Sequence, residues 1–204
     1  MALHMKSKLT LLIWVAVAAA HANEIPPAAV AERAAHVCQA CHGNPARQGI
    51  DSIPEIAGQV PLYIQAQLKD FRSQTRAETD IQAYMWGISA LLDDNTISGL
   101  SEYFAALPAP TGRPGEPGRV AVGRKIFEAG IPDKGVRACA GCHGTKAEGA
   151  SVFPRLAGQK ASYILAQLQV FSTRLRPHGI LMKKEAAGLS QEQMRDLAEY
   201  LQSL

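Results

Sequence analysis

Apolar residues recur at helical spacing in two stretches of the chain. Ile64, Leu68 and Phe71 stand at positions i, i+4 and i+7, and the same stripe returns 100 residues later. Pro61 suits the first turn of the first of these helices. Alternating β-branched runs that would indicate strands are missing from the sequence, so the fold class is predicted to be all-α. Further helices are expected over 30–39, over 119–128, from Asp93 or Asp94 to Phe104, and after a capping-box pattern at Ser190 and Gln193.

The chain consists of two similar halves. Residues 54–71 match residues 154–171 at an offset of 100, and residues 85–107 match residues 182–204 without a gap. A period near 100 indicates two tandem domains rather than a solenoid of short units. Residues 108–118 are dense in Pro and Gly and poor in side chains that pack, which is typical of a linker. We therefore expect helical domains at 23–107 and 119–204, each with a core too thin to be stable unless a cofactor fills it.

Residues 1–22 have the pattern of a secretory signal peptide. Lys6 and Lys8 precede an apolar stretch over 9–20, and residues 20–22 read Ala-His-Ala, a small-x-small cleavage pattern. An uncleaved membrane anchor is the alternative, but a span needs about 20 apolar residues. Cleavage near Ala22 removes two lysines and no acidic residue, which lowers the formal net charge from +3 to +1. A charge this small implies no cationic field for nucleic acid.

All four cysteines lie in two copies of a Cys-x-x-Cys-His motif, the attachment signature of c-type haem. Two thiols three positions apart on one helical turn can add to the two vinyl groups of one haem, and the next residue then presents imidazole to the iron. We therefore predict two covalently bound haem c groups. Their cysteines and proximal ligands would be Cys38, Cys41 and His42 in the first half, and Cys139, Cys142 and His143 in the second.

Other uses of these cysteines fit the sequence less well. Disulfides are common in exported proteins, but each pair here is followed by its own His. A zinc ribbon separates its two Cys pairs by roughly 15 to 20 residues, whereas about 100 residues intervene here. A thioredoxin-like dithiol would require βαβ surroundings, which the helical pattern does not provide.

An iron that only transfers electrons needs a sixth ligand, and a Met thioether opposite His is a soft ligand that raises the reduction potential. The first half has Met85 alone after the signal peptide, and only Met182 occupies the equivalent place in the second half. Both are expected in loop regions, whereas Met194 falls on the apolar stripe of the last helix and is expected in the core. We predict Met85 and Met182 as the axial ligands opposite His42 and His143.

His178 is the alternative ligand, because it lies four residues before Met182 and would give a bis-His haem. The first half has Ile81 at the corresponding place, so we expect His178 to be a surface residue.

Proline-bearing loops follow each motif. Pro54 and Pro154 stand 12 and 11 residues after the ligand histidines. Because a metal-bound His normally donates its second ring N–H to a carbonyl, a rigid loop here is a reasonable partner. Four polar residues on the matched segments are suited to bond haem propionates or each other. They are Gln59, Gln159, Tyr63 and Tyr163.

The sequence resembles the cytochrome c4 family, in which two class I cytochrome c domains stand in tandem. The resemblance covers essentially the whole chain after residue 22 and rests on the paired motifs, on segments 57–68 and 157–168, and on Met85 and Met182 ahead of the closing helices. It implies helical domains wrapped around each haem and facing each other across a pseudo-twofold axis. It further implies a periplasmic electron carrier between a quinol-oxidising cytochrome complex and a terminal oxidase, with peripheral membrane association.

The two halves are not identical, and other functions stay open. The distance from Phe to Met shortens from 14 positions to 11, and Lys183 and Lys184 stand where the first half has Trp86 and Gly87, so the haems should be inequivalent. The first alternative is a dihaem redox enzyme, a peroxidase or a sulfur-compound dehydrogenase, which His178 would favour. The second is a cytochrome subunit of a membrane complex. Two Met ligands leave no open iron position, so we expect an electron-transfer protein and not an enzyme.

Overall fold

The computed structural model describes residues 27–43, 50, 52–77 and 82–204. The predicted signal peptide lies outside these residues. Within the described ranges the regular structure is helical apart from two isolated β-bridges, Ile131 with Val136 and Ala150 with Phe153. Among the described helices, none has the length and apolar character needed to cross a bilayer.

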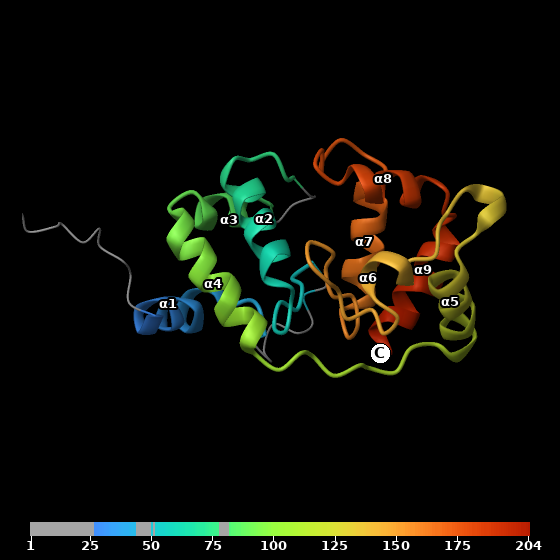
Figure 1. The fold of residues 1–204 in the computed structure, drawn as a ribbon, viewed down its shortest axis with the longest axis horizontal. Coiled ribbons are helices and arrows are strands. Elements are labelled where there is room, and N and C mark those ends of the chain that lie inside the picture. Colours follow the sequence, from blue (N-terminus) through green and yellow to red (C-terminus); the bar gives the residue numbers. More distant parts are fainter. Residues whose placement is uncertain (1–26, 44–49, 51, 78–81) are drawn as a thin grey trace, which may run out of the picture.

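The N-terminal half folds as a small helical unit (Figure 1). As predicted, Asp93 caps the last helix, because its carboxylate accepts a hydrogen bond from the Thr96 N–H at 2.6 Å. Pro61 occupies the first position of its helix, where the missing N–H has no cost. The elements are α1 (Pro27–Arg33), which continues into a π-helical turn η1 (Ala34–Cys38), α2 (Pro61–Arg72), α3 (Gln82–Ser89) and α4 (Asp94–Ala106).

The C-terminal half repeats this design with extra short turns. The predicted capping box is confirmed, because Ser190 Oγ accepts from the Gln193 N–H and Gln193 Oε1 accepts from the Ser190 N–H. The elements are α5 (Pro117–Ala129), η3 (Pro132–Lys134), α6 (Ala140–His143), α7 (Ala161–Phe171), α8 (Ile180–Ala187) and α9 (Gln191–Gln202).

The placement of the two candidate methionines in loops is wrong. Met85 lies in α3 and Met182 lies in α8, each a helix of eight residues. Two turns are too short to develop the apolar periodicity by which longer helices are identified from sequence. The sequence therefore carried no clear sign of either helix.

The segment between the halves is extended and docked. Helix α5 begins at Pro117, with Glu116 as its N-cap, and residues 108–116 form no helix. The Arg113 N–H donates to the Gln202 carbonyl at 2.9 Å, and the Glu116 N–H donates to Glu199 Oε2 at 3.0 Å. The linker was expected to pack poorly. It instead lies along helix α9 and is held there by these hydrogen bonds.

Each half has its own small core. In each, the first and last helices cross closely beside a glycine: Val30 of α1 packs on Gly99, and α9 packs on Gly123 of α5. The N-terminal core comprises Val30, Ala34, Ile64, Leu92, Ile97, Leu100 and Phe104. The C-terminal core comprises Ile126, Phe127, Ala147, Ala157, Ile164, Leu168, Met194, Leu197, Ala198, Tyr200 and Leu201.

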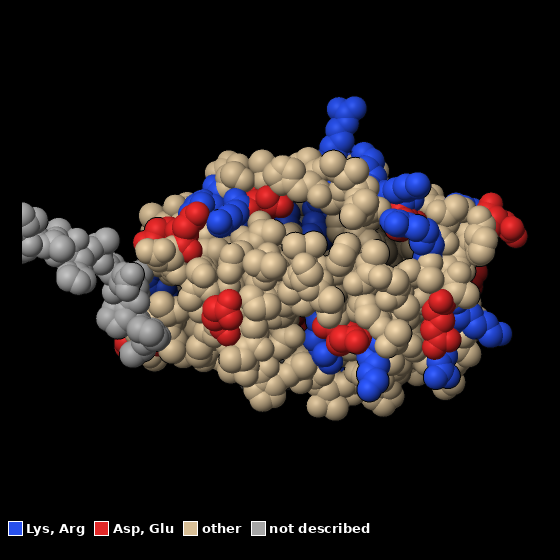
Figure 2. All heavy atoms as spheres, viewed as in Figure 1, with Lys and Arg blue, Asp and Glu red and all other residues tan. Residues whose placement is uncertain are grey.

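Charge divides unequally between the halves. Residues 23–107 contain five Lys and Arg against ten Asp and Glu, whereas residues 108–204 contain 14 against eight. On the face shown in Figure 2, most of the Lys and Arg side chains lie over the C-terminal half. The molecule is therefore a charge dipole along the axis that joins its two domains.

The crossing of α5 and α9 yields a prediction. A Cβ at Gly123 would overlap the Asp196 carbonyl and crowd Tyr200. Gly123→Ala should therefore lower the free energy of unfolding by about 1–3 kcal/mol through overpacking, measured by chemical denaturation. Val122→Ala is the matched control, because Val122 is exposed on the same helix. Equal stability of the two variants would contradict this account.

Candidate functional site

Each motif histidine is oriented by a proline carbonyl. His42 Nδ1 lies 2.9 Å from the Pro54 carbonyl oxygen, and His143 Nδ1 lies 2.9 Å from that of Pro154. Because a carbonyl can only accept, Nδ1 carries the proton and donates. The lone pair is then on Nε2, which is the nitrogen left for a metal. The expected role of the proline loops is confirmed in both halves.

Burial favours the neutral form of both rings. It lowers the pKa of His42 and of His143, and the hydrogen bond to the proline carbonyl opposes this shift only in part. His143 is 5% exposed. A neutral imidazole with a fixed tautomer is the form that binds iron.

The cysteines of each motif share one helical turn. The His42 N–H donates to the Cys38 carbonyl at 2.9 Å, and the His143 N–H donates to the Cys139 carbonyl at 3.0 Å. None of the four cysteines is in a disulfide. Burial raises the pKa of the Cys139 thiol to about 11 and also raises the pKa of the Cys38 thiol.

A four-sulfur zinc site does not form. The two Cys pairs lie in different halves of the chain, where Cys38 packs against one hydrophobic core and Cys139 against the other. Among the described residues, no group of three or more His, Cys, Asp or Glu is placed to hold a metal ion. The groups present in each half are instead one histidine with its Nδ1 bonded to a proline carbonyl, one Cys pair and one candidate methionine. This set fits a covalently attached haem.

The methionines differ in their surroundings. Met85 and Met182 are both partly buried, and Met182 packs against the C-terminal core. Met194 is 3% exposed within that core, as predicted. His178 is a surface residue, also as predicted, but its Nδ1 lies 2.8 Å from Asp70 Oδ1 of helix α2 in the other domain. This contact between domains was not expected.

The loops that orient the histidines also hold the two domains together. Gln59 Oε1 accepts from the Arg155 N–H at 2.7 Å, and Gln59 Nε2 donates to the Arg155 carbonyl at 3.0 Å. Gln159 makes the same pair of bonds with Glu55, at 3.0 and 2.8 Å. The two glutamines therefore bond the backbone of the opposite domain rather than each other. This reciprocity is the pseudo-twofold relation that the resemblance implied.

A glycine in a left-handed conformation shapes each of these loops. Gly58 has φ +64° and Gly158 has φ +73°. The Gly58 N–H donates to the Phe104 carbonyl and the Gly158 N–H to the Leu201 carbonyl, so each loop is fixed to the last helix of its own domain. A Cβ at either position would be strained and would collide with residues of the segment that joins the domains.

Two arginines at the interface were missed by the sequence analysis. Arg76 Nη2 donates to the Tyr163 hydroxyl at 3.0 Å, and Arg176 Nη2 donates to the Tyr63 hydroxyl at 3.3 Å. Their guanidinium groups lie over Phe71 and Phe171, 4.5 and 4.4 Å from the ring centroids. The sign that could have identified them is the same offset of 100 that relates the tyrosines.

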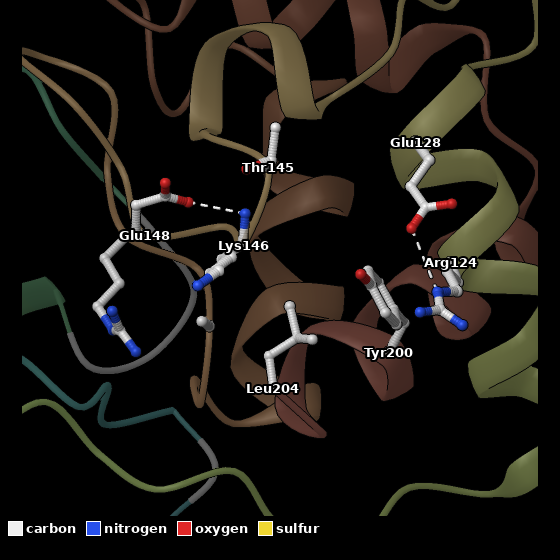
Figure 3. Close-up of a pocket in the computed structure, with 9 residues that line it drawn as sticks. Arg124, Glu128, Thr145, Lys146, Glu148, Tyr200 and Leu204 are labelled. Atoms are coloured by element: carbon white, nitrogen blue, oxygen red, sulfur yellow. Dashed lines mark hydrogen bonds and ion pairs between the residues drawn. The ribbon is translucent and has the colours of Figure 1, made fainter.

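A surface cavity of about 470 Å³ lies elsewhere on the C-terminal domain (Figure 3). Its charged side chains are largely engaged, since Arg124 pairs with Glu128 at 3.2 Å and Glu148 accepts from the Lys146 N–H at 2.8 Å. Neither motif and neither candidate methionine lines it, so we assign it no part in the site. Its lining is Arg124, Glu128, Thr145, Lys146, Glu148, Arg155, Ala157, Tyr200 and Leu204.

Comparison with known proteins gives consistent matches. A sequence model of the family described as cytochrome c matches residues 120–204. Cytochrome c-552 of Acidithiobacillus ferridurans is 38% identical over 82% of this chain and 73% of its own length. Cytochrome c4 of Thiocapsa roseopersicina is 35% identical over 87% of this chain and 92% of its own. The solved cytochrome c4 of Acidithiobacillus ferrooxidans superposes with a TM-score of 0.76 at 36% identity, covering 82% of this chain and 98% of that one.

One further relative carries a different name. A thiosulfate dehydrogenase electron acceptor of Thiomonas intermedia is 32% identical over 80% of this chain and 76% of its own length.

The reciprocal glutamines yield a second prediction. Replacing Gln59 and Gln159 together with Ala leaves four backbone groups at the interface without partners, which should cost about 1–3 kcal/mol for each group that stays buried. The domains should then unfold in two separate calorimetric transitions. Gln169→Ala is the control, because the side chain of this exposed glutamine of α7 bonds Gln191 of its own half. A single transition at an unchanged temperature would refute the role of the glutamines.

Proposed function

Because the chain belongs to the cytochrome c4 family, we propose that it carries electrons in the periplasm from a quinol-oxidising respiratory complex to a terminal oxidase. It is an all-α dihaem cytochrome with two covalently bound haem c groups. The observation that supports the carrier role best is the duplicated donor set. Each half offers a histidine whose Nδ1 is bonded to a proline carbonyl, and one methionine on a short helix.

The proposed attachment and ligation follow from this donor set. Haem c, when bound, supplies a one-electron Fe(III)/Fe(II) couple. The cysteines of each motif hold one haem through thioether bonds, and the neutral histidine ligates through Nε2. The methionine thioether completes the coordination and raises the reduction potential. The ligand pairs are His42 with Met85 and His143 with Met182.

This ligation favours a carrier over an enzyme. With His and Met on each iron, no coordination position is left for a substrate. His178, the residue that would favour catalysis, is exposed and has its Nδ1 engaged with Asp70. Its own position therefore supports a role in domain contact rather than at iron.

The electron donor has a second candidate. The relative from Thiomonas intermedia is a thiosulfate dehydrogenase electron acceptor, so a sulfur-compound dehydrogenase is an alternative electron donor. In both versions the chain remains a carrier, and only the protein that reduces it changes. Export by the segment over 1–22 is part of the proposal in either case.

The methionine assignment predicts a spectroscopic result. Met85→Leu or Met182→Leu should remove one of two methionine-to-iron charge-transfer bands from the oxidised spectrum and open that iron to carbon monoxide. The potential of that haem should fall by a fraction of the ~0.8 V range that axial ligation spans. Met194→Leu is the matched control, since Met194 is buried in the core. An unchanged band and potential in either ligand variant would refute that ligand pair.

A substrate test separates carrier from enzyme. Thiosulfate added alone to the oxidised holo-protein should leave the haems oxidised over the time in which an added thiosulfate dehydrogenase reduces them. Absorbance of the reduced α-band follows the reaction, and sulfate is the control anion. Rapid reduction by thiosulfate alone would identify an enzyme instead.

A further inference from the structure

The side chains of Arg76 and Arg176 share their hydrogen-bond acceptors across the domain interface. Gln67 Oε1 accepts from Arg76 Nη1 at 2.9 Å and from Arg176 Nη2 at 2.7 Å. Gln167 Oε1 accepts from Arg176 Nη1 at 2.7 Å and from Arg76 Nη2 at 3.4 Å. Two cations are therefore held close together between α2 and α7, the central helices of the two domains.

The backbone of the same arginines is tied to the helices that carry the methionines. The Arg76 carbonyl accepts from Trp86 Nε1 at 2.8 Å, and Trp86 follows Met85 in α3. The Arg176 carbonyl accepts from the N–H of Gly179 at 3.0 Å, and Gly179 is the N-cap of α8, which carries Met182. Each arginine thus connects the domain interface with the methionine-bearing helix of its own domain.

The positive charge of Arg176 is not neutralised by its contacts. Its guanidinium bonds two glutamine oxygens and one tyrosine hydroxyl, and it lies over the Phe171 ring. Within the described part of the chain, no carboxylate forms a salt bridge with it. Arg176 is partly buried. A fixed, partly buried cation stabilises the less positive, reduced state of a nearby iron, because partial burial reduces the screening by water. The anionic propionates of the two haems are the counter-charges that such a pair would attract.

We propose that Arg176 and its mirror residue Arg76 are positioning residues that act on both haems at once. The charge of Arg176 raises both reduction potentials, and the backbone bonds of the two arginines align the two methionine-bearing helices with the interface. The inference rests on the proposed dihaem carrier function. Its distinguishing consequence is that replacing Arg176, a residue of the C-terminal domain, also changes the haem of the N-terminal domain.

The test compares two arginines two residues apart. Arg176→Gln removes a positive charge from the interface between the halves. Arg174→Gln removes an equal charge from an exposed side chain of the same segment. Both holo-proteins are titrated by optical spectroelectrochemistry, with covalent haem content and the methionine-to-iron band recorded as checks. We expect Arg176→Gln to shift both one-electron steps to lower potential, and Arg174→Gln to shift them less. Equal shifts in the two variants, or a shift of one step only, would overturn the inference.

Arg176→Lys is a second variant for testing the inference if Arg176→Gln does not accumulate as holo-protein. Arg176→Lys keeps the charge but replaces the planar fork that reaches both glutamines with a single ammonium. Both steps should then move in the same direction as in the Gln variant, by a smaller amount. A shift of one step without the other would contradict the inference. Failure of the wild-type protein to titrate as two one-electron steps would instead count against the proposed function.

Discussion

The hydrogen bond from each motif histidine to a proline carbonyl is the constraint on which the rest of the site depends. It fixes the proton on Nδ1, leaves Nε2 free and holds the ring in one orientation. It also fixes the loop that begins at that proline, and the next residues of the loop bond the opposite domain through Glu55, Gln59, Arg155 and Gln159. The same short segment therefore positions the imidazole within a domain and joins the two domains.

The thin protein cores explain why the cofactor is structural as well as functional. Among the described residues, seven buried apolar side chains form the N-terminal core and eleven form the C-terminal core. Domains of about 80 residues rarely gain enough stability from such cores alone. A haem attached by two thioether bonds adds an apolar surface that each helical layer can cover. One group in each half can thus contribute to folding as well as to electron transfer.

Much of this arrangement could be predicted from the sequence, because the decisive features are local. The cap at Ser190, the helix stripe at Ile64 and Phe71, and the motif histidines each depend on spacings of a few residues. The helices around Met85 and Met182 could not be identified, since eight residues are too few to show a period. The contact between His178 and Asp70 could not be identified either, because it joins residues 108 positions apart that only the docking of the domains brings together.

The reciprocal hydrogen bonds have a consequence for how the chain arose. Gln59 bonds residue 155 and Gln159 bonds residue 55, so each half offers the same patch and receives the same patch in return. Such self-complementary contacts are the mark of an isologous interface, the kind that closes a symmetric homodimer. The two halves of this single polypeptide are therefore arranged like the two subunits of a symmetric dimer. Fusion of two one-haem subunits by a connecting segment, followed by divergence of their sequences, would produce this arrangement.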